Sequence, residues 1–244
     1  MMNRIRENKF QFLAILTLIL VVANTYAIYA YDLEVSRLVR IISSVSIFTF
    51  FLFFKGYLNR IVLFVFALFV LKDLFVLDYE VVTNKTFAFY ASILAYSTLA
   101  FLGVKKTDIL KSTPSIVLFG VLLVGINIFN VYYLSDIIQA VLDNQIQYSL
   151  FFVQGAVLLL LGISAGLYYN KYTGKIPLYY LYFVVCFIFS DIFGLAAYFF
   201  DVGFAYYPER ILYILALVVL TSFALEKNYQ RIYGNTESEK KLLF

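Results

Sequence analysis

The stretch Phe69-Val70-Leu71-Lys72-Asp73-Leu74-Phe75 places a carboxylate inside an apolar run that is long enough to cross a bilayer. A second stretch, Phe187-Ile188-Phe189-Ser190-Asp191-Ile192-Phe193, repeats this arrangement, and the two align as F-x-x-x-D-[LI]-F. Asp73 and Asp191 are the only acidic residues that we place inside the hydrocarbon of the bilayer. An ionisable side chain in hydrocarbon costs at least ~2.5–3.5 kcal/mol on insertion scales, so by default it indicates a functional site. The alternative is a polar contact that only joins two helices.

The composition is that of a polytopic membrane protein. Of the 244 residues, 63% are hydrophobic and 14% are charged, whereas a soluble protein carries roughly 25% charged residues. The chain has no histidine, which excludes zinc or haem ligation by histidine and the most usual general base. The single cysteine, Cys186, cannot form an intramolecular disulfide, and we interpret it as a packing residue.

Eight apolar runs are each near the ~20 residues that a helix needs to cross the hydrocarbon core. The first is too long for the core of a signal peptide, so we expect it to be retained. Short connections predict that neighbouring helices are antiparallel. The sequence therefore predicts an all-α fold, with one transmembrane domain of eight helices over residues 1–225 and a polar cytoplasmic tail over 226–244. The expected spans are approximately Phe10–Tyr31, Leu38–Phe54, Ile61–Leu77, Thr86–Val104, Pro114–Leu134, Tyr148–Tyr169, Ile176–Phe200 and Tyr206–Leu225.

The distribution of basic residues predicts the orientation. With the N-terminus inside, fourteen of the 19 Lys and Arg residues fall on cytoplasmic segments. Four fall on outside segments or helix ends, namely Arg37, Arg40, Lys85 and Arg210. Cytoplasmic loops of membrane proteins carry such an excess. We therefore expect both termini to be cytoplasmic, and the basic residues to reflect topology rather than nucleic-acid binding.

Polar side chains gather in the outer half of the predicted bundle, where depth is estimated at ~1.5 Å per residue. Asp73 and Asp191 both lie there, while the inner halves of the helices are almost entirely Leu, Ile, Val and Phe. Such a layer is expected if the side chains line a cavity that binds a substrate, although each amide could instead serve an interhelical hydrogen bond. Lys72 could snorkel or pair with Asp191. The candidate substrate-binding residues are Asn24, Lys72, Asn127, Asn130, Gln154 and Arg210.

Two short segments carry a resemblance to a known family. Ser190-Asp191-Ile192-Phe193-Gly194-Leu195-Ala196 resembles the S-D-x-L-x-A segment in the seventh helix of the YhhN-type lysoplasmalogenase family, and Asp73-Leu74-Phe75-Val76-Leu77 is similar to its G-D-x-x-L segment in the third helix. Eight short-looped helices with cytoplasmic ends also fit that family. The chain departs from the pattern at Lys72, where the family usually has glycine, and at Leu217, where it commonly has glutamine.

The resemblance implies hydrolysis of the vinyl-ether bond of a lysoplasmalogen, which releases a fatty aldehyde. This reaction begins with proton transfer to carbon and then adds water to an oxocarbenium-like cation. One buried carboxyl can supply the proton while a second, ionised carboxylate stabilises the cation and orients water. We expect Asp73 and Asp191 to share these catalytic roles, with a lipid as the partner and no metal or cofactor required.

Two other functions remain open from the sequence. A small proton-coupled transporter could use Asp73, Asp191 and Lys72 as a relay, and would be marked by broken helices at matching positions in two halves. A non-catalytic protein would pair Asp73 with Asp191 and leave no cavity between them. The sequence is compatible with an integral protein of a bacterial inner membrane.

Overall fold

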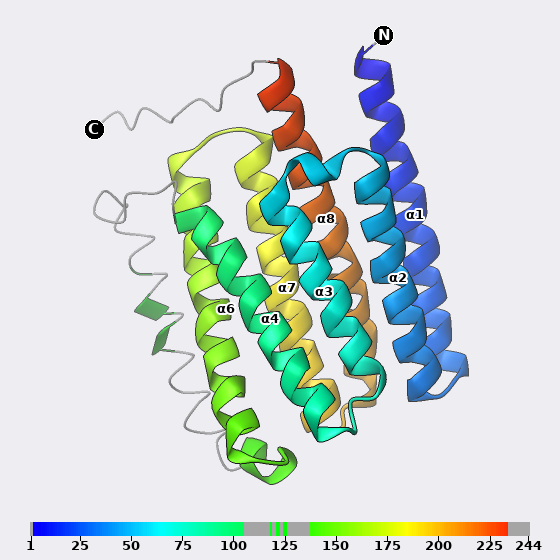
Figure 1. Cartoon of the computed structure of the whole chain (residues 1–244), viewed down its shortest axis with the longest axis vertical. Coiled ribbons are helices and arrows are strands. Elements are labelled where there is room, and N and C mark those ends of the chain that lie inside the picture. The colour runs from blue at the N-terminus through cyan, green and yellow to red at the C-terminus, as the bar shows by residue number, and fades with distance from the viewer. Residues whose placement is uncertain (1, 105–117, 119–120, 123, 126–136, 234–244) are drawn as a thin grey trace.

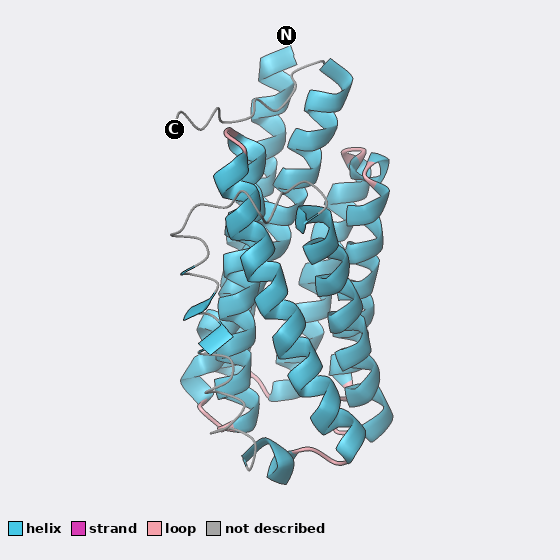
Figure 2. Cartoon of the chain, turned by 90° about the vertical axis from the view of Figure 1, so that its left-hand side faces the viewer, coloured by secondary structure: helices cyan, strands magenta, loops and turns pink. Residues whose placement is uncertain are grey.

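The computed structural model describes residues 2–104, 118, 121–122, 124–125 and 137–233, with only the backbone for residues 2–8 and 232–233. All regular structure in these ranges is helical, as Figure 2 shows. The long helices are α1 (Met2–Ala30), α2 (Leu33–Phe53), α3 (Arg60–Leu77), α4 (Val82–Val104), α6 (Gln145–Lys171), α7 (Lys175–Phe199) and α8 (Tyr206–Tyr233), and the short 3-10 helices are η1 (Gly56–Leu58) and η3 (Gly203–Ala205).

The long helices run along one common axis and form a closed ring (Figure 1). Each helix packs against the next in the order α1, α2, α3, α4, α6, α7 and α8, and α8 packs in turn against α1. Helices that are joined by a short connection are antiparallel, as predicted, whereas α4 and α6 run in the same direction. The N-terminus and the described end of α8 lie at the same end of the bundle.

Six of the helical segments are long and apolar enough to cross a membrane, which supports an integral membrane protein. The third helix, α3, is shorter, with 18 residues, and carries Arg60, Lys72 and Asp73. The predicted fifth span, Pro114–Leu134, lies outside the described residues. The number of eight spans therefore stays a prediction, while the all-helical class is confirmed for the described part of the chain.

Local sequence explains where several helices begin. Asn144 is the N-cap of α6, where its side chain accepts a hydrogen bond of 2.9 Å from the backbone N–H of Gln147. Pro177 and Pro208 stand in the first turns of α7 and α8, where a missing N–H does no harm. Several observed ends differ from the prediction, and those of α2 and α8 bear on the buried charges. Helix α2 begins at Leu33 rather than Leu38, and α8 continues to Tyr233, past the boundary predicted after Leu225.

An ion pair fastens α4 to the start of α6. Lys85 Nζ lies 2.8 Å from Asp143 Oδ2. Hydrogen bonding from Lys85 lowers the pKa of the Asp143 carboxyl. Beside it, the buried Gln147 side chain donates to the backbone carbonyl of Val82 at 3.0 Å. These contacts hold α4 and α6 side by side at the end of the bundle opposite the N-terminus.

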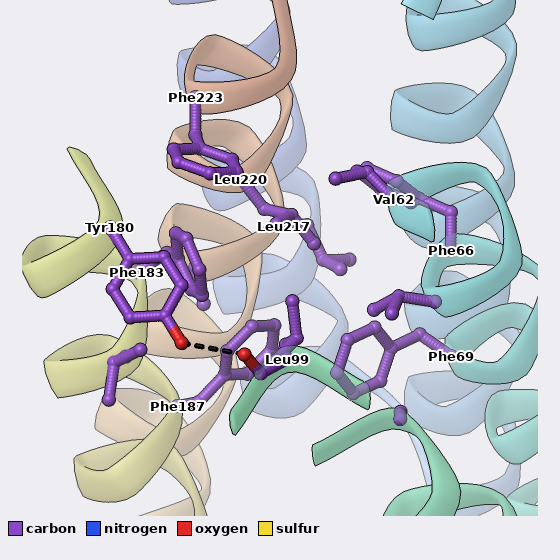
Figure 3. Packing of buried hydrophobic residues seen from close by; sticks show 14 of the residues in the cluster. Val62, Phe66, Phe69, Leu99, Tyr180, Phe183, Phe187, Leu217, Leu220 and Phe223 are labelled. Carbon is purple, nitrogen blue, oxygen red and sulfur yellow. Dashed lines mark hydrogen bonds between the residues drawn. The ribbon is translucent and has the colours of Figure 1, made fainter. Parts of the chain in front are cut away.

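The core is built from stacked aromatic side chains between α3, α7 and α8 (Figure 3). The rings of Phe69 and Phe187 stack with centroids 4.7 Å apart, and the Tyr180 hydroxyl donates to the backbone carbonyl of Leu99 at 2.7 Å. The outer surface is also apolar, since Phe12, Leu18 and many similar side chains are more than half exposed. An apolar exterior is what a lipid environment requires.

Candidate active site

A buried ionic cluster joins α2, α3 and α8. Arg40 is at its centre: its Nε donates to Asp73 Oδ1 at 2.8 Å and its Nη1 donates to Glu209 Oε1 at 2.9 Å. The Tyr213 hydroxyl donates to the other oxygen, Asp73 Oδ2, at 2.8 Å. The guanidinium of Arg40 also stacks over the Tyr213 ring at 4.3 Å. Each Asp73 oxygen therefore has a donor, and its side chain is fully buried.

A second cluster surrounds Asp191 of α7. Its Oδ1 accepts a hydrogen bond of 3.0 Å from the Tyr96 hydroxyl on α4, and its Oδ2 accepts one of 3.0 Å from the Gln154 side chain on α6. Lys72 Nζ of α3 lies 3.9 Å from Oδ1, which is close enough for an ion pair but too far for a hydrogen bond. Four helices thus converge on one carboxylate.

The two clusters meet along one cavity of about 310 Å³. Its walls come mainly from α4, α6 and α7 and are largely apolar, with Phe89, Phe151 and Leu158 among them. Four charged side chains line it: Arg40, Lys72, Asp191 and Glu209. The volume is at the lower end of the range for small-molecule sites, and a mostly apolar wall with a few convergent polar groups is typical of such sites.

Glu209 is a buried carboxylate whose two oxygens have different surroundings. Oε1 accepts from Arg40, whereas Oε2 lies 3.3 Å from Arg210 Nε and has no hydrogen-bond partner among the described residues. Glu209 is 3% exposed and lines the cavity. Removing a charge from water is costly unless it is paired, and the two flanking arginines offset the cost of burying the Glu209 side chain.

The structure brings some of the predicted site residues together. Asp191, Lys72 and Gln154 line the same cavity. Asp73 lies behind Arg40 and does not line it. Asn24 donates to Ser43 Oγ at 2.7 Å between α1 and α2, which is a helix-joining contact away from the cavity.

Of the remaining predicted residues, Arg210 does not line the cavity. Arg210 lies near the start of α8, at the predicted outer end of the bundle, and is completely buried beside Glu209 and Ser36. The reason is that its side chain finds a carboxylate and a hydroxyl within the bundle. Asn127 and Asn130 lie outside the described residues.

Sequence reasoning missed Arg40, Glu209, Tyr96 and Tyr213. Arg40 and Arg37 were counted as charges at a helix end, but they are 4% and 3% exposed in the folded chain. Glu209 is a further acid buried within the bundle, with 3% of its surface exposed. A charge near the end of an apolar run gives no sign of whether it faces water or a partner helix; only the tertiary arrangement decides.

Known proteins offer no further identification. No protein family, curated protein or solved structure matches this chain. Among the described residues, no group of three acidic or cysteine side chains is placed to hold a metal ion. The chemistry must therefore be inferred from the cavity and from the side chains around it.

Proposed function

We propose that this protein is an integral-membrane hydrolase that cleaves the vinyl-ether bond of a single-chain ether lipid of the lysoplasmalogen type. The observation that carries the proposal is the cavity, where Asp191 and Glu209, with Arg40 and Lys72, border a mostly apolar space. An apolar wall suits the alkyl chain of such a lipid, and the charged side chains suit its polar part. Two carboxylates supply the acid and the base that vinyl-ether hydrolysis needs.

The surroundings of the two carboxylates suggest their roles. Glu209 lies between Arg40 and Arg210, and we assign it the role of stabilising a cation and orienting water. Asp191 has a single cationic neighbour within ion-pair distance among the described residues, Lys72 at 3.9 Å, and is the better candidate for proton donor. This differs from the expectation that Asp73 contacts the substrate, which stays untested.

The reaction balances with these groups. Protonated Asp191 delivers its proton to the vinyl carbon that bears the alkyl chain, and the carbon next to the ether oxygen becomes an oxocarbenium ion. Water adds to that carbon and returns one proton to Asp191, with Glu209 holding the water. The resulting hemiacetal collapses to a fatty aldehyde and an alcohol. Asp73 acts as a positioning residue, because it fixes Arg40 and Tyr213 behind the cavity.

The test is aldehyde release from a lysoplasmalogen by the purified protein in detergent. We expect activity in the parent, and a loss of roughly 10²–10⁴-fold in Asp191→Asn and in Glu209→Gln, the range for a removed acid or base. Asp201→Asn is the matched control, since Asp201 is exposed and its positive φ of 53° is readily adopted by Asn. No aldehyde from the folded parent across several headgroups would overturn the proposal.

The finer topology belongs to the same proposal. We propose eight spans with both termini cytoplasmic, in a bacterial inner membrane. The support is the excess of Lys and Arg on the predicted cytoplasmic segments. In this orientation the cavity opens in the outer half of the bundle.

A further inference from the structure

Lys72 is a buried amine that the proposed reaction does not use. It lines the cavity with 9% of its surface exposed. Its Nζ makes no hydrogen bond to any described residue, and lies 5.6 Å and 6.0 Å from the ring centroids of Tyr213 and Tyr96. By contrast, Lys85 contacts its carboxylate, Asp143, at 2.8 Å. Lys72 is thus held loosely, with Asp191 as a nearby counter-ion.

We infer that Lys72 is an attachment site for a long-chain aldehyde, which it binds covalently as an imine. Lysine amines in apolar pockets, or beside another cation, are the ones that form Schiff bases with carbonyl compounds. Both surroundings are present: the cavity wall is mostly apolar, and Arg40 stacks on the same Tyr213 ring that Lys72 approaches. The apolar wall selects an aldehyde with a long hydrocarbon chain.

The step needs no oxidant or reductant. Lys72 first gives up a proton, for which Asp191 is the nearest acceptor at 3.9 Å. The neutral amine adds to the carbonyl carbon, and the oxygen takes up that proton to give a carbinolamine. A second proton transfer to this hydroxyl releases water as the C=N bond forms. A protonated imine then has the Asp191 carboxylate as its counter-ion.

The aldehyde could come from two sources with the same chemistry. It could enter from the bilayer as a free fatty aldehyde, or it could be the product of ether-lipid cleavage at the same cavity. The inference does not rest on the proposed hydrolysis, because an added aldehyde tests the amine directly. Adduct formation without hydrolysis, or hydrolysis without an adduct, would separate the two claims.

The experiment is reductive trapping of the full-length protein in detergent. Hexadecanal is added with cyanoborohydride, which transfers hydride to the imine carbon and fixes a secondary amine. Peptide mass spectrometry then locates the hexadecyl group. We expect Lys72 to be the most modified lysine, with at least ~10-fold less adduct in Asp191→Asn, because a proton-transfer partner contributes a factor of this order or more. Incubation with a lysoplasmalogen instead of hexadecanal distinguishes the second source.

Two variants and a shorter aldehyde serve as controls. Lys72→Arg keeps the positive charge but cannot form an imine, so the adduct at this peptide is lost. Lys85→Arg keeps a partly buried cation elsewhere and leaves the adduct at Lys72 unchanged. Butanal, which lacks the long chain, is expected to modify Lys72 less. Two results with the folded parent protein alone would overturn the inference. One is adducts confined to other lysines, and the other is equal labelling of Lys72 and exposed lysines.

Discussion

At the scale of single residues, Arg40 organises the interior of the bundle. It contacts one carboxylate from α3 and one from α8, and stacks on the ring of Tyr213. Breaking a buried pair by removing one partner typically costs ~3–5 kcal/mol, whereas an apolar replacement of the whole pair can be neutral. Retention of several charges beside a cavity therefore points to a role beyond stability.

A prediction at this scale concerns Tyr213→Phe. The change removes the hydroxyl that donates to Asp73 Oδ2 at 2.8 Å and leaves this oxygen without its described donor. We expect a loss of ~1–3 kcal/mol in the free energy of unfolding, the cost of a buried polar group left unpaired. Aldehyde release should fall less than in Asp191→Asn, because Asp73 does not line the cavity.

The free energy of unfolding is measured by titration with a denaturing detergent, and the rate of aldehyde release is measured on the same variant. Tyr182→Phe is the matched control, since the Tyr182 side chain is 51% exposed on the apolar outer surface. Unchanged stability of Tyr213→Phe would contradict a contribution of the hydroxyl to the cluster.

The sequence could single out one acid of the cavity, Asp191, but neither Glu209 nor its partner Arg40. A carboxylate in the middle of an apolar run is anomalous by itself, so Asp73 and Asp191 were found. Glu209 lies in the first turn of α8, and Arg40 lies near the predicted start of its span at Leu38, where charge is ordinary. Their burial depends on α2 and α8 packing against each other and against α3, which no local pattern contains.

At the scale of elements, apolar runs predicted the existence of the described helices but not all of their ends. Helix α2 starts earlier because the polar turn Glu34–Arg37 is helical, and Arg37 pairs with Glu80 at 2.8 Å instead of facing water. Helix α8 ends later because a helix can continue beyond its apolar stretch. Hydropathy identifies the residues that can face lipid. A helix can continue past those residues into polar sequence where the polar side chains find partners.

Close packing of α4 against α6 and α7 gives a second prediction. A Cβ at Gly103 would lie 2.6 Å from Tyr180 Oη and 2.9 Å from Ser164 Oγ, too close for either. We expect Gly103→Ala to displace Tyr180 from the Leu99 carbonyl and to destabilise the fold by ~1–3 kcal/mol, the usual cost of overpacking.

Gly166→Ala on α6 is the matched control. A Cβ there meets no described atom within 4 Å, so the higher helix propensity of alanine should leave stability equal or raise it by up to ~1 kcal/mol. Both variants are compared by thermal unfolding in the same detergent. Equal melting temperatures for Gly103→Ala and the parent would show that α4 can move away from Tyr180 without cost.

At the scale of the whole molecule, the two ends of the bundle differ in charge. Of the four basic residues assigned from sequence to the end opposite the N-terminus, Arg37, Arg40 and Arg210 are buried in ion pairs or beside carboxylates. Only Lys85 remains near the surface there, and it pairs with Asp143. The end that carries the N-terminus exposes Lys55, Arg60, Lys175 and Arg231. Because these three arginines are buried, the difference in exposed basic charge between the two ends is larger than the sequence count alone gives. This difference predicts cytoplasmic termini.

The last prediction follows from this asymmetry. In a Cys186→Ala background, single cysteines are introduced at Tyr57, between α2 and α3, and at Val202, between α7 and η3; both positions are 46% exposed. A membrane-impermeant maleimide should label Val202→Cys in intact spheroplasts, and Tyr57→Cys only after lysis. The reverse pattern would place the termini and their basic residues outside. Equal labelling of both before lysis would contradict a membrane-spanning bundle, because the α2–α3 and α7–η3 connections lie at opposite ends of the bundle. Because the two positions are equally exposed in the protein, only the bilayer can make their labelling differ, and each position serves as the control for the other.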